Sequence, residues 1–210
     1  TWFMAIVYLP YVVYFYLLGL ERFQYSIVAG AFIALMIFEG GIYAAPYTML
    51  LLLLFSVLYA LFSKYGKAVP LKALGLIVLF TALFSAIKLL PTVEFFLQHP
   101  RLIESTDLIS PKLLYYMFLF RTQHITIHAG PYGWWEYGNY IGLIPMLLGI
   151  IGILLYFRQQ IVLILAGSAF FLLGVGDFGS VSPWNLLHRL PVFRSAPIPS
   201  LSLIAFLFMF

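Results

Sequence analysis

The chain has 210 residues and a formal net charge of +4, and 64% of its residues are hydrophobic while only 9% are charged. Soluble domains usually carry about 25% charged residues, so this composition excludes an ordinary soluble fold and predicts an integral membrane protein. The chain has no Cys and no dense Lys/Arg cluster, which excludes disulfides and thiolate metal sites and leaves nucleic acid outside the expected partners.

Long apolar runs predict the membrane-spanning helices. The first span is predicted at 2–20. The run from 27 to 63 would be roughly 55 Å long as one helix, whereas the hydrocarbon core is about 30 Å thick. It must therefore be broken, and the stretch FEGGIYAAP is the expected break because Gly40 and Gly41 free the backbone and Pro46 suits a helix start. The spans predicted after the first are 26–39, 44–63, 71–90, 138–156, 161–175 and an incomplete run at 198–210.

These runs predict an all-α, polytopic transmembrane helix bundle of about six to seven spans. The beginning of the chain has no signal-peptide pattern, and the run that starts near Ile198 is about half the length of a span. Both features favour a single transmembrane domain, 1–210, that is a segment of a longer protein.

Positive charge in the short linkers predicts the orientation of the bundle. Short linkers on one side contain Arg22, Lys64, Lys67, Lys72 and Arg158, and the excess of Lys and Arg in short loops places that side in the cytoplasm. The remaining polar sections, 91–137 and 176–196, then face the outside, together with Glu39.

Two short interfacial helices are predicted in the first external section. Pro91 and Pro100 bracket TVEFFLQ (92–98), because Pro suits a first helical turn and discourages helix in the residue before it. Its Glu94 either lines a cavity or is a surface residue near a base. The second helix, SPKLLYYMFLF (110–120), begins with Ser110 as N-cap and is too short to span.

Two histidines in RTQHITIH (121–128) are the candidate metal ligands. His124 and His128 share one face of either a helix or a strand. Glu136 or Asp177 is the candidate third ligand for a divalent cation. The alternative is a pair of ordinary loop histidines, and no other cofactor is expected.

Aromatic residues surround a carboxylate in GPYGWWEYGNYIGLIP (130–145). Trp134 and Trp135 precede Glu136 directly. The aromatics either form an interfacial belt or stack on sugar rings, in which case Glu136 suits a general acid or base.

Two arginines follow a predicted helix start at Ser182 in the second external section. Arg189 and Arg194 can hold a phosphate or pyrophosphate by bidentate hydrogen bonds. Alternatively they pair with Asp177, with Glu94 or with lipid headgroups.

Several of these segments, in order, resemble the YfhO-like bacterial membrane proteins, which are grouped with the GT-C glycosyltransferase superfamily. The resembling pieces are AIKLLPTVEFFLQHPR (86–101), WEYGNYIGLIPMLLGIIGIL (135–154) and LHRLPVFRSAPIPS (187–200). FEGGIYAAPYTMLLLLLFSVLYAL (38–61) is similar to a helix–break–helix that many of that family carry with Gly-His-Pro, where this chain has Glu39-Gly-Gly.

The resemblance implies an enzyme of the bacterial cytoplasmic membrane that takes a sugar from a polyprenyl-phosphate carrier on the outer face and modifies a cell-envelope lipid, polymer or glycan. The resemblance implies that the acidic site residues are Glu39, Glu94 and Glu136. It implies that the basic site residues are Arg189 and Arg194. Glu39 or Glu136 is the expected catalytic acid, and Arg194 the expected phosphate partner. The expected partners are membrane lipids and the lipid-linked sugar donor.

Two other functions are compatible with the same residues. A transporter or flippase of lipid-linked saccharides would need polar residues at mid-membrane depth, and often carries internal repeats. A non-catalytic envelope assembly protein would need none of the predicted site residues.

Overall fold

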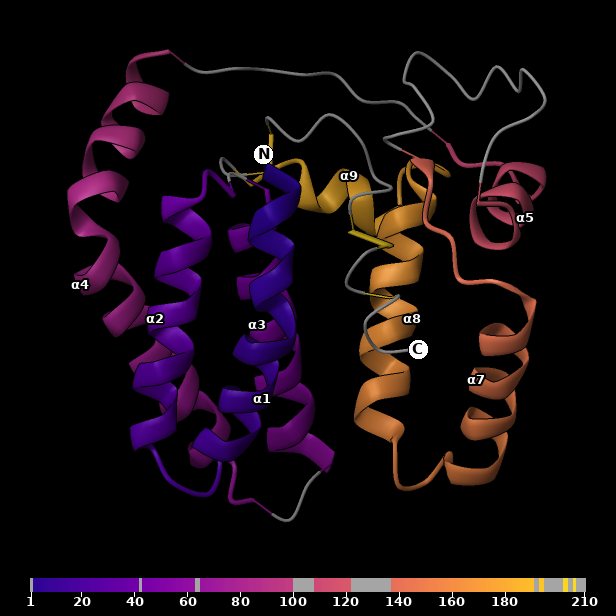
Figure 1. Cartoon of the computed structure of the whole chain (residues 1–210), viewed down its shortest axis with the longest axis horizontal. Coiled ribbons are helices and arrows are strands. Elements are labelled where there is room, and N and C mark those ends of the chain that lie inside the picture. The colour runs from indigo at the N-terminus through magenta and orange to yellow at the C-terminus, as the bar shows by residue number, and fades with distance from the viewer. Residues whose placement is uncertain are drawn as a thin grey trace. The chain divides into compact units, whose positions relative to one another are not determined.

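The computed structural model describes residues 2–41, 43–62, 65–99, 108–121, 137–190, 193–194, 202–203 and 206. Within these residues every regular element is a helix, and the extended segments meet only in one isolated bridge, between Leu108 and Gly176. The predicted all-α class is therefore confirmed for the described residues. The chain divides into two compact units, Thr1–Arg101 (unit 1) and Leu102–Phe210 (unit 2), and each is described by itself (Figure 1).

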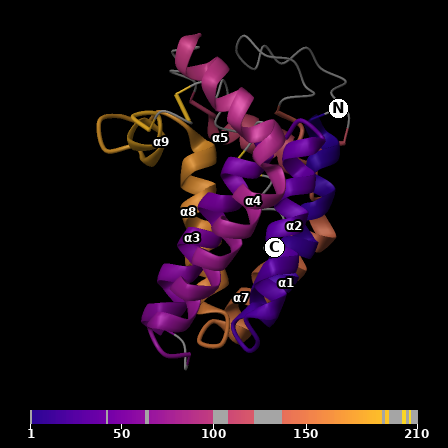
Figure 2. The same ribbon diagram turned by 90° about the vertical axis from the view of Figure 1, so that its left-hand side faces the viewer.

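Unit 1 is a bundle of helices that run up and down in turn (Figure 2). Its helices lie close to the predicted runs, and the linkers are short. In chain order they are η1 (Trp2–Tyr8), α1 (Leu9–Gly19), α2 (Gln24–Phe38), α3 (Ala44–Phe62) and α4 (Ala68–Gln98).

The predicted break at 38–46 is confirmed, and its hydrogen bonds explain why α2 ends there. Gly40 has a φ of 84°, the left-handed conformation that glycine adopts without strain. The Gly41 N–H donates to the Met36 carbonyl at 2.9 Å, and the Gly40 N–H donates to the Ile37 carbonyl at 3.1 Å. This pair of bonds is a Schellman motif, which satisfies carbonyls that the helix end would leave without partners.

Substitution of Gly40 tests this helix end. Gly40→Ala is expected to lower the free energy of unfolding by about 1–2 kcal/mol, because a Cβ destabilises the left-handed conformation by that amount. No heavy atom lies within 4 Å of the position that the Cβ would take, so a steric clash does not contribute. Thermal unfolding of the purified protein in detergent measures the change, and an unaltered midpoint would contradict the strained turn.

Close packing of small residues joins α2 to α4. The buried positions of α4 recur every three or four residues, at Pro70, Ala73, Ile77, Thr81 and Ser85. On α2 they meet Gly30, where an added Cβ would lie 3.1 Å from the Ile77 carbonyl oxygen. The Thr81 hydroxyl donates to the Gly30 carbonyl at 3.3 Å. Small residues at such a crossing let two backbones approach closely, as at helix interfaces in membranes.

The prediction that Pro91 begins a separate short helix is wrong. Pro91 lies inside α4, which continues without interruption to Gln98. A proline in a helix removes one backbone hydrogen bond, and α4 continues in spite of that loss. Hydroxyl groups before and after Pro91 bond to carbonyls one turn earlier in the same helix. The Thr92 hydroxyl donates to the Lys88 carbonyl at 2.7 Å, and the Ser85 hydroxyl donates to the Thr81 carbonyl at 2.6 Å.

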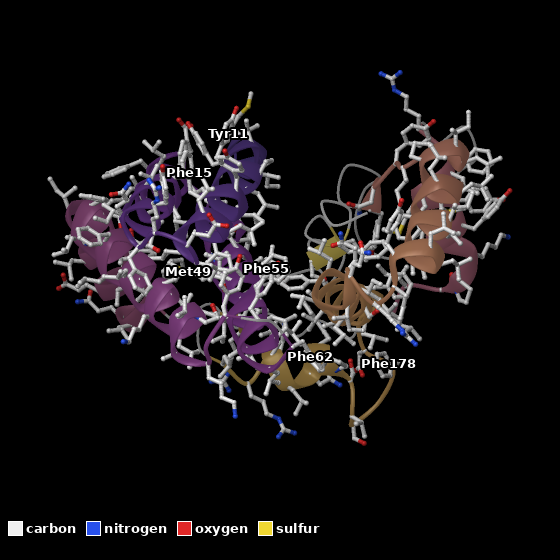
Figure 3. The ribbon with its side chains drawn as sticks, turned by 90° about the horizontal axis from the view of Figure 1, so that it is seen from below. Tyr11, Phe15, Met49, Phe55, Phe62 and Phe178 are labelled. Atoms are coloured by element: carbon white, nitrogen blue, oxygen red, sulfur yellow. The ribbon has the colours of Figure 1, made fainter. Side chains whose placement is uncertain are left out.

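Two described helices, α3 and α4, are long and apolar enough to cross a membrane. A soluble core helix can pass the same test, but such a helix is mostly buried. Only 22% of the apolar window of α4 is buried, so most of its surface is not covered by protein in unit 1. The apolar helices α1 and α2 are shorter, and Tyr11 and Phe15 of α1 stack on Phe32 of α2 at centroid distances of 5.3 and 5.6 Å (Figure 3).

Unit 2 contains α5 (Pro111–Leu119), α7 (Leu143–Tyr156), α8 (Ile161–Val175) and α9 (Pro183–Leu187). The predicted start of α5 is confirmed, because the Leu113 N–H donates to the Ser110 hydroxyl at 3.2 Å. Around α5 lies a small core. Its buried members are Ile109, Leu113, Met117, Tyr137 and Leu203.

The predicted span at 138–156 is shorter than expected, because α7 begins only at Leu143. The preceding residues are not helical, since the N–H groups of Ile141 and Gly142 both donate to the Phe118 carbonyl at 2.9 Å. Gly142, the residue before α7, has a φ of 87°, a conformation that glycine adopts without strain. None of the fourteen residues of α7 is buried.

Candidate functional site

Glu39 lies at the carboxyl end of α2, directly after the last helical residue, and its side chain is exposed. The neighbouring carbonyl, that of Phe38, accepts a hydrogen bond of 2.8 Å from the Lys88 ammonium group of α4. A cation at this place offsets the partial negative charge of the helix end. Glu39 and Lys88 therefore belong to one end of unit 1, where α2 meets α4.

Glu94 lies on the part of α4 that continues beyond Lys88, and it is exposed. Its carboxylate accepts a hydrogen bond of 3.4 Å from the Gln98 amide. One turn of helix further on, the His99 ring stacks on Phe95 at a centroid distance of 4.8 Å. The carboxyl ends of α2 and α4 point to the same end of unit 1 (Figure 1), so Glu94 and Glu39 share that end.

Arg189 and Arg194 lie in unit 2, in the turns that follow α9, and both are exposed. Their backbone N–H groups donate to the carbonyls of Leu186 and Leu190, at 3.3 and 3.1 Å. Neither guanidinium forms an ion pair with any residue in the described part of the chain. Both can therefore reach an anion from solution or from a membrane surface.

Asp177 does not pair with either arginine. Its carboxylate accepts hydrogen bonds from the Asn185 amide at 2.7 Å and from the Gly179 N–H at 3.0 Å. The buried Ser182 hydroxyl donates to the Gly176 carbonyl at 2.6 Å in the same turn. Asp177 thus holds together the turn that connects α8 and α9 by accepting these hydrogen bonds. The next residue in this turn, Phe178, is exposed (Figure 3).

The remaining predicted site residues lie outside the described residues. They are Glu136, Trp134, Trp135, His124 and His128. Among the residues that are described, no group of three His, Asp or Glu side chains could hold a metal ion. The predicted divalent-cation site therefore stays a prediction.

Lys88 was not among the predicted site residues. Its contact with α2 could not be read from the sequence, because the two residues are 50 positions apart. One signal was present: Lys88 is the only ionisable residue between Lys72 and Glu94 in an apolar helix. A lone charge in such a run usually has a specific partner.

The described site residues offer two kinds of chemistry. Exposed carboxylates at Glu39 and Glu94 can accept a proton or orient a hydroxyl group. The guanidinium groups of Arg189 and Arg194 can bind phosphate oxygens in pairs. No family model, no curated protein and no solved structure matches this chain.

Proposed function

We propose that this chain is part of a polytopic membrane glycosyltransferase. It takes a sugar from a polyprenyl-phosphate carrier at the outer membrane surface and transfers it to a cell-envelope lipid, polymer or glycan. The six apolar segments of the described helices, η1–α1, α2, α3, α4, α7 and α8, are its membrane spans.

The observation that carries the proposal is the distribution of charge along these helices. No Asp, Glu, Lys, Arg or His occurs within α1, α2, α3, α7 or α8. The charged residues of unit 1 gather at its two ends instead, with Glu21, Arg22 and Lys67 at one end and Glu39 and Lys88 at the other. This arrangement suits reactive groups that act at the surface of the membrane.

The same distribution favours an enzyme over a transporter. A transporter of charged lipid-linked sugars needs polar groups halfway through the membrane. Apart from Gln24 at the start of α2, the polar side chains inside α1, α2 and α3 are hydroxyl groups. Two of them satisfy each other, because the hydroxyls of Tyr16 and Ser56 lie 2.9 Å apart.

The proposed mechanism assigns a carboxylate and an arginine to the transfer. Glu39 or Glu136 takes the proton of the acceptor hydroxyl, whose oxygen forms the new bond to the anomeric carbon of the sugar. The bond between that carbon and the phosphate oxygen breaks, and polyprenyl phosphate leaves with the electron pair. Arg194, with Arg189, binds the phosphate and stabilises its developing charge. Exposed apolar side chains beside the arginines, Leu186 and Leu190, suit the lipid portion of the donor.

Sugar transfer by the full-length natural protein tests the proposal. Membranes that contain the protein are incubated with radiolabelled polyprenyl-phosphate hexoses, and the label that enters the lipid and polymer fractions is counted. Glu39→Gln and Arg194→Ala are each expected to lower transfer at least about tenfold, because each removes a group that acts on the reacting atoms.

Matched controls come from two short linkers, the one between α1 and α2 and the one between α7 and α8. Glu21→Gln and Arg158→Ala remove the same charges from exposed positions near the predicted cytoplasmic surface, and both are expected to leave transfer unchanged. Equal transfer by all four variants would refute the assigned roles. A carrier lipid that crosses the bilayer of proteoliposomes without loss of its sugar would establish the transporter instead.

A further inference from the structure

The last three turns of α4 extend beyond the helices that accompany the rest of it. Lys88 contacts the end of α2 through the Phe38 carbonyl, and no residue of α4 after Ser85 is buried. Two views at right angles show α4 continuing past the ends of α2 and α3 (Figures 1 and 2). We call residues 89–98 the arm.

The arm is amphipathic. At 3.6 residues per turn, five of its apolar side chains fall within about one third of the helix circumference, while Phe95 lies on the other side and stacks on His99. The five side chains are Leu89, Leu90, Val93, Phe96 and Leu97. The opposite side carries Glu94 and Gln98. Leu90, Val93 and Leu97 are exposed, whereas Leu89 and Phe96 are half-buried, so most of the apolar side is left uncovered.

This apolar side continues a surface that runs along the whole of α4. Exposed residues lower in the helix occupy the same third of its circumference. They are Leu71, Val78, Leu79 and Leu83. The face that packs on α2 lower down continues in the arm as Thr92 and Phe95, which have no helix of unit 1 beside them that buries them.

Length decides where the arm can lie. Lys72 and Lys88 are about 24 Å apart along the helix, which is close to the thickness of the hydrocarbon core when lysine side chains extend toward the headgroups. An upright arm would place Leu97 about 13 Å beyond Lys88, outside the headgroup layer. There its apolar side would face water, although its pattern is that of a helix in the interface.

We propose that the arm lies in the outer headgroup region of the membrane, with its apolar side against the acyl chains and Glu94 and Gln98 toward water. Pro91, at the base of the arm, lacks the N–H that would hold this turn of α4 straight. The partner of the apolar side is therefore the lipid surface. This inference does not depend on the proposed enzymatic activity.

Spin labels on single cysteines test the arm, and the 210 residues of this chain contain no Cys that would compete for the label. Leu90, Val93, Glu94, Leu97 and Gln98 are each replaced by Cys in this chain. The labelled variants are placed in liposomes of phosphatidylcholine and phosphatidylglycerol. Collision with oxygen, which concentrates in the acyl chains, is compared with collision with a water-soluble nickel chelate. The ratio is expected to oscillate with a period of about 3.6 residues, and oxygen should prevail at 90, 93 and 97.

Two reference positions calibrate the measurement. Leu83→Cys, on the exposed side of α4 within the membrane, is expected to favour oxygen, and Glu21→Cys, in the linker after α1, is expected to favour nickel. If the nickel chelate collided freely with the labels at all five arm positions, the arm would lie in water. Immobile labels with low access to both reagents at 90, 93 and 97 would mean that another protein surface covers them. Either outcome would overturn the proposal.

Discussion

Gly30→Leu is expected to lower the free energy of unfolding of unit 1 by about 3 kcal/mol, the upper end of the usual range for overpacking. A Cβ at this position would lie 3.1 Å from the Ile77 carbonyl oxygen and 3.2 Å from the Thr81 backbone nitrogen. Both atoms belong to the backbone of α4 and cannot move aside as a side chain would. The substitution therefore separates α2 from α4 and also stretches the Thr81–Gly30 hydrogen bond.

Gly75→Leu is the matched control for this substitution. Gly75 lies in α4 on the exposed side, and no heavy atom lies within 4 Å of the position of its Cβ. Leu in place of Gly is expected to stabilise the helix by up to about 1 kcal/mol because Leu has the higher helix propensity. Both variants are compared by thermal unfolding in detergent. Equal midpoints would show that α2 and α4 do not pack at Gly30.

Ser56→Ala is expected to cost about 1–3 kcal/mol of stability, the penalty for a buried polar group without a partner. Ser56 on α3 and Tyr16 on α1 are both fully buried, and their hydroxyl oxygens lie 2.9 Å apart. Phe55 and Tyr59 flank the Tyr16 ring at centroid distances of 6.3 and 6.4 Å. In Ser56→Ala the buried phenolic hydroxyl of Tyr16 loses this hydrogen-bond partner.

The reciprocal substitution should cost less. In Tyr16→Phe, the Ser56 hydroxyl can turn to the carbonyl four residues earlier in its own helix, as serine does in helices. The double variant leaves neither hydroxyl and is expected to be more stable than Ser56→Ala alone. A double-mutant cycle of unfolding free energies measures the coupling. If the two single substitutions lowered the free energy of unfolding equally, and if their effects simply added in the double variant, the hydrogen bond between α1 and α3 would be contradicted.

The sequence predicted a helix start or end correctly where the conformation or side chain of one or two local residues determines it. Gly40 and Gly41 predicted the break between α2 and α3, because only glycine takes the positive φ of 84° without strain. Ser110 and Pro111 predicted the start of α5 for a similarly local reason. In such cases the deciding hydrogen bonds join residues three to five positions apart.

Two predictions about helix starts were wrong. Pro91 predicted a helix start because proline suits a first helical turn, but α4 continues through it to Gln98. The run at 138–156 predicted one helix, but the N–H groups of Ile141 and Gly142 donate to the distant Phe118 carbonyl, and α7 begins only after them. Neither an apolar pattern nor a helix propensity contains such a contact.

The candidate site shows the same division. The sequence singled out Glu39 and Glu94 as lone acids next to apolar runs, and the fold places both at one end of unit 1. The role of Lys88 required the fold, because its partner is a backbone carbonyl of another helix. The residue types also did not predict that Asp177 accepts hydrogen bonds within its own turn and pairs with neither Arg189 nor Arg194.

The sequence by itself determined the helical class, the order of the apolar runs and the sorting of charge to their ends. These follow from composition and from the cost of charge in an apolar environment. Only the tertiary structure decided which face of α4 packs on α2 and which stays exposed. Every face of that helix is rich in apolar residues, so hydrophobicity cannot choose between them. Gly30 and Thr81 make the choice, because close approach of two backbones depends on the shape of both surfaces.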